Sequence, residues 1–322
     1  MEDSPRSPRG VSPAGVRPQS PREVVGNNGG GMLLIAENLN VMDKTLRQAM
    51  KERKKEPLQK IAREAAKRGL DVLDLNIGPA RKDGPSLMEW VIAAVREVAD
   101  LPLSLDTTNI EAMRVGLEME GDRAIINSIQ ATPERMEQLL PLMQKHGARC
   151  IALLIGKEGM PRDATERGAL AAEFAAAVDE YGIPHERVFF DPVVLPVAYQ
   201  QDQVVAVIEF MRMLKEMLPD FNSTCGLSNV SNGVPAELRP LVNRTYLAML
   251  ADCGMTSAIV DLFDSHLVSL ARGGSQNIAG IIRRTVEGNE DFAGLSEEET
   301  AYAKTVRVLL GKTIYSHSWL KL

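Results

Sequence analysis

One recurring pattern constrains the fold of this chain most: a short apolar run ends on Asp, Asn or Ser, and a helical pattern follows. The stretch Leu101–Asn109 (LPLSLDTTN) is the clearest case, because its leucines alternate with smaller or polar residues, as in a short strand. Asp106 ends this run, and Thr107 to Asn109 are good N-cap residues for the helical pattern of Ile110–Glu118. The sequence therefore predicts a carboxylate at the carboxyl end of a core strand.

Four further stretches repeat this pattern. They are VLDLNIG (Val72–Gly78), AIINSIQ (Ala124–Gln130), VFFDPVVLP (Val188–Pro196) and CGLSNVSNG (Cys225–Gly233). Polar residues at the carboxyl ends of several different strands are typical of the active site of a (β/α)8 barrel.

In chain order, the sequence predicts eight strand–helix units. The predicted strands are Leu33–Asn38, Val72–Gly78, Leu101–Asn109, Arg123–Ile129, Arg149–Ile155, Val188–Val194, a seventh that leads into Leu227, and Ala258–Phe263. The predicted helices with stated bounds are Lys44–Arg68, about Ser86–Val98, Ile110–Glu118, Glu166–Tyr181, about Pro240–Cys253 and Thr300–Leu310, and one more begins near Ser265. Two further helices are predicted from their apolar faces. One carries Met136, Leu139, Leu140 and Met143, and the other carries Val204, Val207, Ile208, Met211 and Leu214.

Strands that alternate with helices predict a parallel sheet, and eight units in about 240 residues fit one closed α/β barrel, a single-domain TIM barrel. An open, doubly wound sheet is the alternative. It is disfavoured because no GxGxxG opens any of the helices and because polar strand ends are spread over the whole chain.

The two ends of the chain differ from this regular pattern. Residues 1–31 are rich in Pro, Gly, Ser and Arg, have no apolar periodicity and no secretory core, and are predicted to be a disordered tail. Residues 32–322 then form the barrel domain. Within it, residues 273–299 are polar and acidic, and we expect an excursion before the last helix.

Composition excludes several classes of protein. A net charge of −6 and a pI near 5.5 argue against general affinity for nucleic acid or anionic membranes. The sequence contains no run of about 18 apolar residues, so no membrane span is predicted. The three cysteines are odd in number and widely spaced, which indicates neither a disulfide framework nor a zinc knuckle, so we expect a cytoplasmic protein.

Motifs for metal, nucleophilic and phosphate-loop chemistry are missing. The four histidines form no HxH or HExxH motif, no GxSxG elbow is present, and GxxxxGK[ST] is absent, so no metal site is predicted. The polar strand ends remain as candidate site residues: Asn76, Asp106, Asn127, Asp191, Ser228 and Asn229. Each could instead cap a helix or hold a turn. Together, carboxylates and amides suit a flat, neutral heterocycle rich in N–H donors, which a carboxylate can bind through two parallel hydrogen bonds.

Six segments, taken in order, carry a resemblance to a known family. They are LDLNIGP (Leu73–Pro79), SLDTTN (Ser104–Asn109), INS (Ile126–Ser128), DPVVLP (Asp191–Pro196), GLSNVS (Gly226–Ser231) and NRTYLAML (Asn243–Leu250). The chain resembles the pterin-binding family, and within it most closely the methyltetrahydrofolate:corrinoid/iron–sulfur protein methyltransferases. The resemblance implies a TIM barrel, usually a homodimer, that binds methyltetrahydrofolate without a metal. It also implies transfer of the N5-methyl group to Co(I) of a corrinoid (cobalamin) carried by a partner protein.

The resemblance also implies residue roles. Asp106, Asn127 and Asp191 would hold the pterin, Asn229 would reach N5, and Asp191 would share in the catalytic step. Asn76, Gly226 and Ser228 complete the expected pterin site. The pathway stays open between acetyl-CoA synthesis and demethylation of methyl donors, as part of one-carbon metabolism.

Two alternative functions also stay open. One is a dihydropteroate synthase-like enzyme, which typically carries a late Lys and Arg for a pterin diphosphate, where this chain has Ser228 and Asn229. The other is a non-catalytic subunit that binds folate or docks a corrinoid protein.

Overall fold

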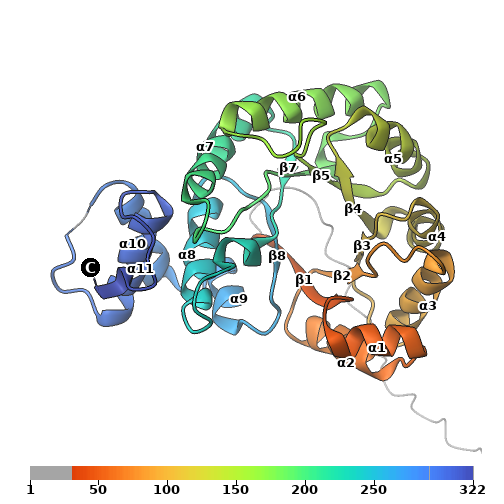
Figure 1. Cartoon of the computed structure of the whole chain (residues 1–322), viewed down its shortest axis with the longest axis horizontal. Helices are drawn as coiled ribbons and strands as arrows, with labels where there is room; N and C mark the ends of the chain where they lie inside the picture. Colours follow the sequence, from red (N-terminus) through yellow and green to blue (C-terminus); the bar gives the residue numbers. More distant parts are fainter. Residues whose placement is uncertain (1–30, 290, 322) are drawn as a thin grey trace, which may run out of the picture.

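Eight parallel strands form a closed ring in the computed structural model, which describes residues 31–289 and 291–321 (Figure 1). Their order is β7-β6-β5-β4-β3-β2-β1-β8. The strands are β1 (Leu33–Asn40), β2 (Val72–Asn76), β3 (Leu103–Asp106), β4 (Ala124–Gln130), β5 (Arg149–Leu153), β6 (Val188–Asp191), β7 (Asn222–Ser223) and β8 (Ser257–Val260). This arrangement confirms the predicted TIM barrel. The predicted disordered tail lies outside the described residues except for Gly31.

The ring closes between β7 and β8 through few hydrogen bonds. The backbone N–H of Ile259 donates to the carbonyl of Cys225 at 2.9 Å, and Gly226 forms a parallel bridge with Ile259. Next to it, the N–H of Ser223 donates to Oγ1 of Thr256 at 2.9 Å. The seventh strand is therefore shorter than the sequence pattern predicts, because Leu227–Ser231 turns into a short 3-10 helix, η3.

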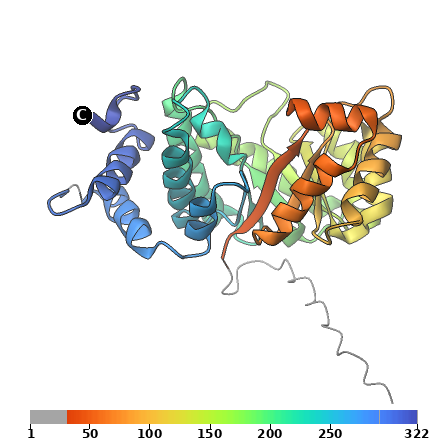
Figure 2. The same ribbon diagram turned by 90° about the horizontal axis from the view of Figure 1, so that it is seen from below.

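Helices surround the ring and bury their apolar faces against it (Figures 1 and 2). They are α1 (Lys44–Glu52), α2 (Glu56–Lys67), α3 (Gly84–Arg96), α4 (Ile110–Glu120), α5 (Pro133–His146), α6 (Ala164–Glu180), α7 (Gln201–Met217), α8 (Arg239–Asp252), α9 (Ser265–Ala271), α10 (Gln276–Val286) and α11 (Glu297–Leu309). The predicted stripes on α5 and α7 are buried, as expected for helices that cover a barrel. No helix among the described residues is both long and apolar enough to span a bilayer.

The interior of the barrel is filled by an apolar layer, which we call the plug. It consists of Ile35, Val72, Ile125, Ile151 and Phe189, with Leu33 and Ile259 packed against it. Side chains alternate along a strand, so the residue two positions after each plug residue also points inward. We call the end of the barrel at the carboxyl ends of the strands the mouth. The plug closes the barrel interior below the mouth.

The chain beyond the barrel forms a helical hairpin beside α8 (Figures 1 and 2). Its first helix, α10, lies within the predicted polar excursion and was not anticipated from the sequence. It buries Ile278, Ile281 and Ile282. Gln201, at the start of α7, donates to the carbonyls of Val308 and Thr313 at 2.6 and 2.7 Å and so ties the end of the hairpin to the barrel.

Asn109 connects the end of β3 with helix α4 and the preceding loop. Its Oδ1 accepts from the backbone N–H groups of Glu111 and Ala112 at 3.0 and 3.1 Å, and its Nδ2 donates to the carbonyl of Ala80 at 3.1 Å. Asn109 is thus the N-cap residue of α4, and Asp106 stays free of that task.

We expect Asn109→Ala to destabilise the fold by about 1–2 kcal/mol, because the first turn of α4 loses its cap and Ala80 loses a donor. Thermal melting should show a drop of about 2–4 °C for a chain of this size. Asn109→Asp is the matched control, since it keeps the capping oxygen and loses only the donor to Ala80. An unchanged melting temperature in Asn109→Ala would contradict this role.

Candidate functional site

The register of the first four strands brings polar residues into one row at the mouth. Asn40 is paired with Asn76, Asn76 with Asp106, and Asp106 with Asn127, as nearest neighbours across β1 to β4. The three predicted site residues of this half of the barrel, Asn76, Asp106 and Asn127, are therefore adjacent because parallel strands in register align their ends.

A second polar layer lies directly below this row, on the plug. Asp74 and Ser104 are paired across β2 and β3, and the hydroxyl of Ser104 donates to Oδ1 of Asp74 at 2.5 Å. Asn127 Nδ2 donates to the same oxygen at 2.9 Å, while Asn76 Nδ2 donates to Oδ2 of Asp106. The two amides therefore each hold a carboxylate in a fixed orientation.

Burial dominates the electrostatics of this pair of carboxylates. Removal from water raises the pKa of Asp106, and the charge of Asp74 raises it further, while the hydrogen bond from Asn76 lowers it. Burial also raises the pKa of Asp74 against the hydrogen bonds from Ser104 and Asn127. None of the ion pairs between described residues includes either carboxylate. A ligand that donates N–H groups would satisfy oxygens that the protein leaves poorly solvated.

Asp191 lies at the end of β6 and extends the site to the other half of the ring. Its Oδ1 accepts from the backbone N–H of Val193 at 2.8 Å, and the backbone of Gly226 donates to it as well. Burial raises the pKa of Asp191 to about 6, although both backbone bonds and the charge of Arg167 lower it. Asp191 is thus a third buried carboxylate acceptor at the carboxyl end of a barrel strand.

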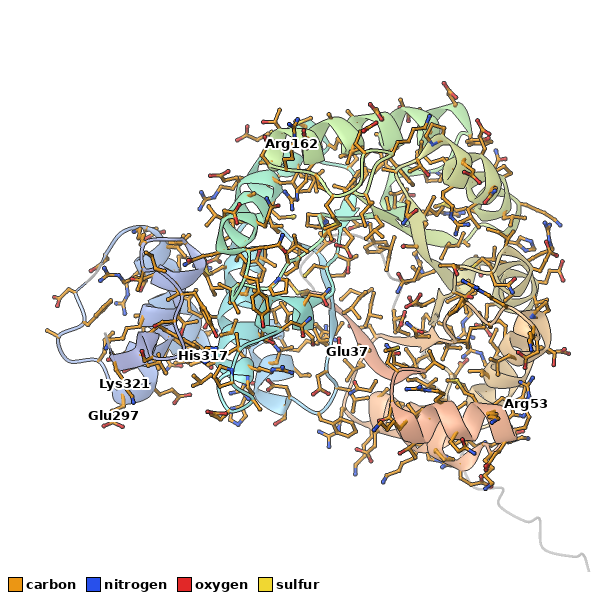
Figure 3. All side chains as sticks on the ribbon, in the orientation of Figure 1. Glu37, Arg53, Arg162, Glu297, His317 and Lys321 are labelled. Atoms are coloured by element: carbon orange, nitrogen blue, oxygen red, sulfur yellow. The ribbon has the colours of Figure 1, made fainter. Side chains whose placement is uncertain are left out.

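Glu37, on β1, is a site residue that the sequence analysis missed. It lies at the interior of the ring of strands (Figure 3), and its Oε1 accepts from the hydroxyl of Ser228 at 2.6 Å. Burial raises the pKa of Glu37 to about 7, with smaller upward contributions from Asp261 and Asp74 and an opposing one from the Ser228 bond. The carboxyl group of Glu37 is therefore a candidate for proton exchange near neutral pH.

Asp74 and Asp261 were also missed, because the sequence analysis considered only the polar residues that end an apolar run. Asp261 follows β8 and accepts at 2.8 Å from Asn38 Nδ2. All three acids stand two positions after a residue of the plug or one packed on it, namely Ile35, Val72 and Ile259. Strict alternation along each strand was the sequence signal that could have found them.

The segment Gly226–Ser231 holds Asn229 at the outer edge of the site. Asn229 is exposed, and its side chain forms no hydrogen bond within the described residues. Its Nδ2 lies 3.0 Å from the position that a Cβ on Gly226 would occupy, so a larger residue at 226 would push against it. The turn is closed by backbone bonds instead, such as Asn229 N–H to the carbonyl of Gly226 at 3.2 Å. The amide of Asn229 is thus available to a ligand.

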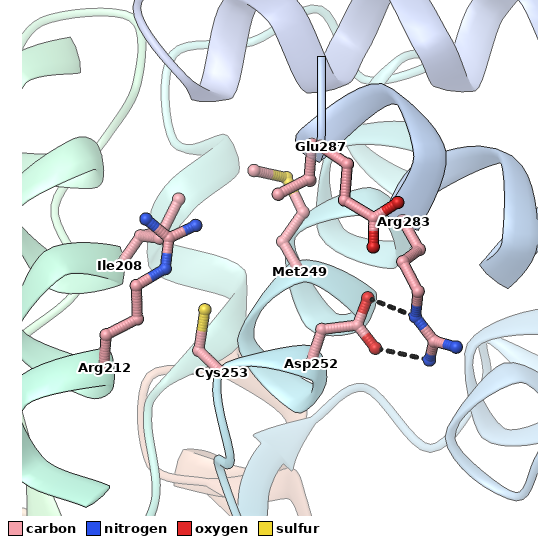
Figure 4. Close-up of a pocket in the computed structure, with 8 residues that line it drawn as sticks. Ile208, Arg212, Met249, Asp252, Cys253, Arg283 and Glu287 are labelled. Atoms are coloured by element: carbon pink, nitrogen blue, oxygen red, sulfur yellow. Dashed lines mark hydrogen bonds and ion pairs between the residues drawn. The ribbon is translucent and has the colours of Figure 1, made fainter. Parts of the chain in front are cut away.

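A separate cavity of about 330 Å³ lies between α7, α8 and α10 (Figure 4). Asp252 and Cys253 line it at the end of α8, which is the end of the barrel opposite the mouth. There, Asp252 pairs with Arg283 of α10 at 2.7 Å and fastens the hairpin to the barrel. None of the candidate site residues lines this cavity, so the chemistry of the site belongs to the mouth.

Fold and site together define an α/β barrel whose mouth presents buried carboxylates and amides. Within the described residues, no three His, Cys, Asp or Glu side chains are grouped as ligands for a metal ion. Residues 36–261 match the family described as pterin binding enzyme, and the chain belongs to this family.

Three known proteins are similar to this chain. Methionine synthase of Mycobacterium tuberculosis (strain ATCC 25618 / H37Rv) is 30% identical over 240 residues, covering 71% of this chain. The match spans only 20% of that protein's length. The methylcorrinoid:tetrahydrofolate methyltransferase of Eubacterium limosum is 24% identical over 232 residues, 71% of this chain and 85% of that protein. A dihydropteroate synthase structure from Xanthomonas albilineans has a TM-score of 0.57 at 18% identity, covering 77% of this chain and 93% of the other.

These matches differ in what they support. The structural match shows the fold alone, because its identity is low. The sequence relatives support a pterin-binding methyltransferase, which agrees with the resemblance carried by the six sequence segments.

The buried pair Asp74 and Asp106 should make stability depend on pH. Both pKa values are raised in the folded state, so the folded protein holds protons that the unfolded chain has already released. Stability is therefore lost as pH rises from the ordinary Asp value through the folded values. We expect Asp106→Asn to be more stable than wild type by about 1–3 kcal/mol near pH 8, and to lose this advantage near pH 4.

Thermal melting of both proteins across this pH range measures the difference. Asp220→Asn is the control, because Asp220 is exposed. If Asp106→Asn melted no higher than wild type at the alkaline end, the carboxylate of Asp106 would not be desolvated as described.

Proposed function

We propose that this protein is a methyltransferase that moves the N5-methyl group between methyltetrahydrofolate and Co(I) of a corrinoid on a partner protein. The observation that carries the proposal is the row of Asn76, Asp106 and Asn127 at the mouth, together with Asp191 at the carboxyl end of β6. This row offers oriented acceptors with amides beside them, which matches the N–H-rich edge of a neutral pterin ring. The Eubacterium limosum relative is named for the same pair of methyl carriers.

The charge of the site favours a neutral ring over a pterin diphosphate. Five acids lie at or below the mouth: Glu37, Asp74, Asp106, Asp191 and Asp261. None of the ion pairs between described residues includes any of them. A diphosphate here would meet like charges, which disfavours the dihydropteroate synthase-like alternative. Ser228, moreover, is engaged with Glu37.

The chemistry requires help for the departing nitrogen. When the methyl group leaves N5, the electron pair of the C–N bond stays on nitrogen. N5 must therefore be protonated, and so positively charged, before or as the bond breaks, and it then departs as a neutral secondary amine. Asn229 can orient N5 and its proton by a hydrogen bond but cannot itself supply the proton. We assign the proton to a relay through Asp191 and water, with Glu37 as a second source, because its pKa near 7 suits proton exchange. A positioned dipole at such a centre contributes about 10²–10³ in rate.

The proposal includes properties that the fold does not address. A homodimer, a cytoplasmic location and a role in acetyl-CoA synthesis or methyl-donor demethylation follow from the family resemblance and are proposed here on that ground. This chain covers one fifth of the length of methionine synthase, so the complete reaction of that protein is not carried over to this chain.

The direct test combines binding and turnover. We expect methyltetrahydrofolate to bind one site per subunit in titration calorimetry, with unchanged affinity after chelator treatment. Mixed with free cob(I)alamin, the complex should produce methylcobalamin absorbance. Loss of binding on chelation would contradict metal-free recognition. Binding without transfer would favour the non-catalytic alternative, and tighter binding of a pterin diphosphate would favour the synthase-like one.

We expect Asn229→Ala to lower the single-turnover rate of methyl transfer by about 10²-fold, because the transition state loses its hydrogen bond to N5. Cobalt absorbance at saturating methyltetrahydrofolate measures this rate. Asn232→Ala, in the same turn and also exposed, is the matched control and should transfer at the wild-type rate. A folded Asn229→Ala protein with wild-type transfer would remove Asn229 from the mechanism.

A further inference from the structure

Arg167, on α6, is a buried cation that the proposed reaction leaves without a role. Its side chain is 0% exposed, and burial lowers its pKa. None of the ion pairs between residues 31–289 and 291–321 includes it. A guanidinium buried without a carboxylate in contact is unfavourable for folding, so its position calls for a compensating interaction.

That interaction is a set of hydrogen bonds to oxygens from three segments. Nε donates to the carbonyl of Pro192 at 2.7 Å, Nη1 to the carbonyl of Asp163 at 3.1 Å, and Nη2 to Oε1 of Gln203 at 3.0 Å. Gln203, on α7, in turn donates to the carbonyl of Arg162 at 2.7 Å. Arg167 therefore fastens the segment after β6 to the starts of both α6 and α7.

The segment that it holds is the one that shapes the Asp191 site. We call Asp191–Pro196 the strap. Val193 has φ of +63°, a left-handed conformation that a β-branched residue adopts only when its surroundings impose it. This conformation aims the N–H of Val193 at Oδ1 of Asp191. Beyond the strap, the N–H of Val197 donates to the carbonyl of Val230 at 2.9 Å, next to Asn229.

We infer that Arg167 is a positioning residue: through the Pro192 carbonyl it holds the strap in this turn and so fixes the Asp191 carboxylate at the mouth. The inference rests on the proposed function only for the identity of the ligand. Lysine could not replace the guanidinium fully, since a single ammonium cannot address the same three oxygens in one plane.

Arg167 also acts on the charge of Asp191. Its positive charge lowers the pKa of Asp191 against the effect of burial. Two acids at the start of α6, Asp163 and Glu166, also act on the Arg167 guanidinium and favour its charged form. The remaining titratable groups that face this pair are the thiol of Cys225 and the phenol of Tyr246, on α8. Burial raises both of their pKa values well above the usual range, so both are neutral at pH 7. Removal of the guanidinium charge should therefore leave Asp191 protonated over a wider pH range.

Three variants separate these effects: Arg167→Gln removes the charge, Arg167→Lys keeps it without the planar fork, and Gln203→Leu removes one of the acceptors. Two measurements are made on each. The first is methyltetrahydrofolate affinity as a function of pH. The second is the ¹³C titration of Asp carboxyl groups in the ligand-free protein, with Asp191→Asn to assign the signal.

We expect Arg167→Gln to move the titration midpoint of Asp191 upward by about one pH unit and to weaken methyltetrahydrofolate binding about tenfold at pH 7. Arg167→Lys and Gln203→Leu should weaken binding by several-fold while the midpoint stays close to that of wild type. Arg96→Gln is the matched control, because Arg96 donates to the carbonyl of Leu101 at 2.8 Å beside Glu120, at the opposite end of the barrel. It should lower the melting temperature and leave both site measurements unchanged.

Wild-type affinity together with a wild-type Asp191 titration in Arg167→Gln would overturn the inference. If that variant does not fold, wild-type affinity in both Arg167→Lys and Gln203→Leu would overturn it. Failure of the proposed function is distinguishable. A wild-type protein that binds no methyltetrahydrofolate, but whose Asp191 titration shifts in Arg167→Gln, would refute the function and support the positioning role.

Discussion

The site depends on one constraint: the alternation of side chains along the barrel strands, which places a polar group two residues beyond four of the five plug residues, whereas Ile151 is followed by Leu153. The pairs, two residues apart on five strands, are Ile35 and Glu37, Val72 and Asp74, Ile125 and Asn127, Phe189 and Asp191, and Ile259 and Asp261. The plug excludes water from below, and the surrounding strands exclude it from the sides. Burial is accordingly the largest cause of the raised pKa of Glu37, Asp74, Asp106 and Asp191.

This arrangement opposes stability and favours binding for the same physical reason. A carboxylate with few water molecules around it is unfavourable in the empty protein, and hydrogen bonds from Ser104, Asn76 and Asn127 only partly compensate. A ligand with several N–H donors supplies the missing partners, so part of its affinity arises from relief of this penalty. The large apolar layer between strands and helices lets the fold tolerate such a site.

The sequence predicted the ring of strands well, because polar residues at strand ends break apolar runs visibly, as at Asp106 and Asp191. Glu37 was missed because it stands inside a strand, where only its spacing of two residues from Ile35 points inward, and its contact with Ser228, 191 residues away in the chain, forms only when the barrel closes. The seventh strand was predicted to lead into Leu227, whereas β7 ends at Ser223 and a 3-10 helix held by backbone bonds begins at Leu227. Helix α10 was missed, because glycines and arginines around Ile278 and Ile282 make the segment polar on average. Its apolar face is buried by packing outside the barrel.

The two halves of the site are held by different means. On β1 to β4, the backbone register itself aligns Asn76, Asp106 and Asn127, and amide–carboxylate bonds then fix their side chains. On the other half, β7 has two residues, and closure toward β8 relies on a few bonds around Cys225 and Gly226. Side-chain bonds from Arg167 and the strap must therefore supply the order that a longer ladder would give. Because such bonds open more readily than a continuous sheet, we expect the half with Asp191 and Asn229 to be the more adjustable part of the proposed site.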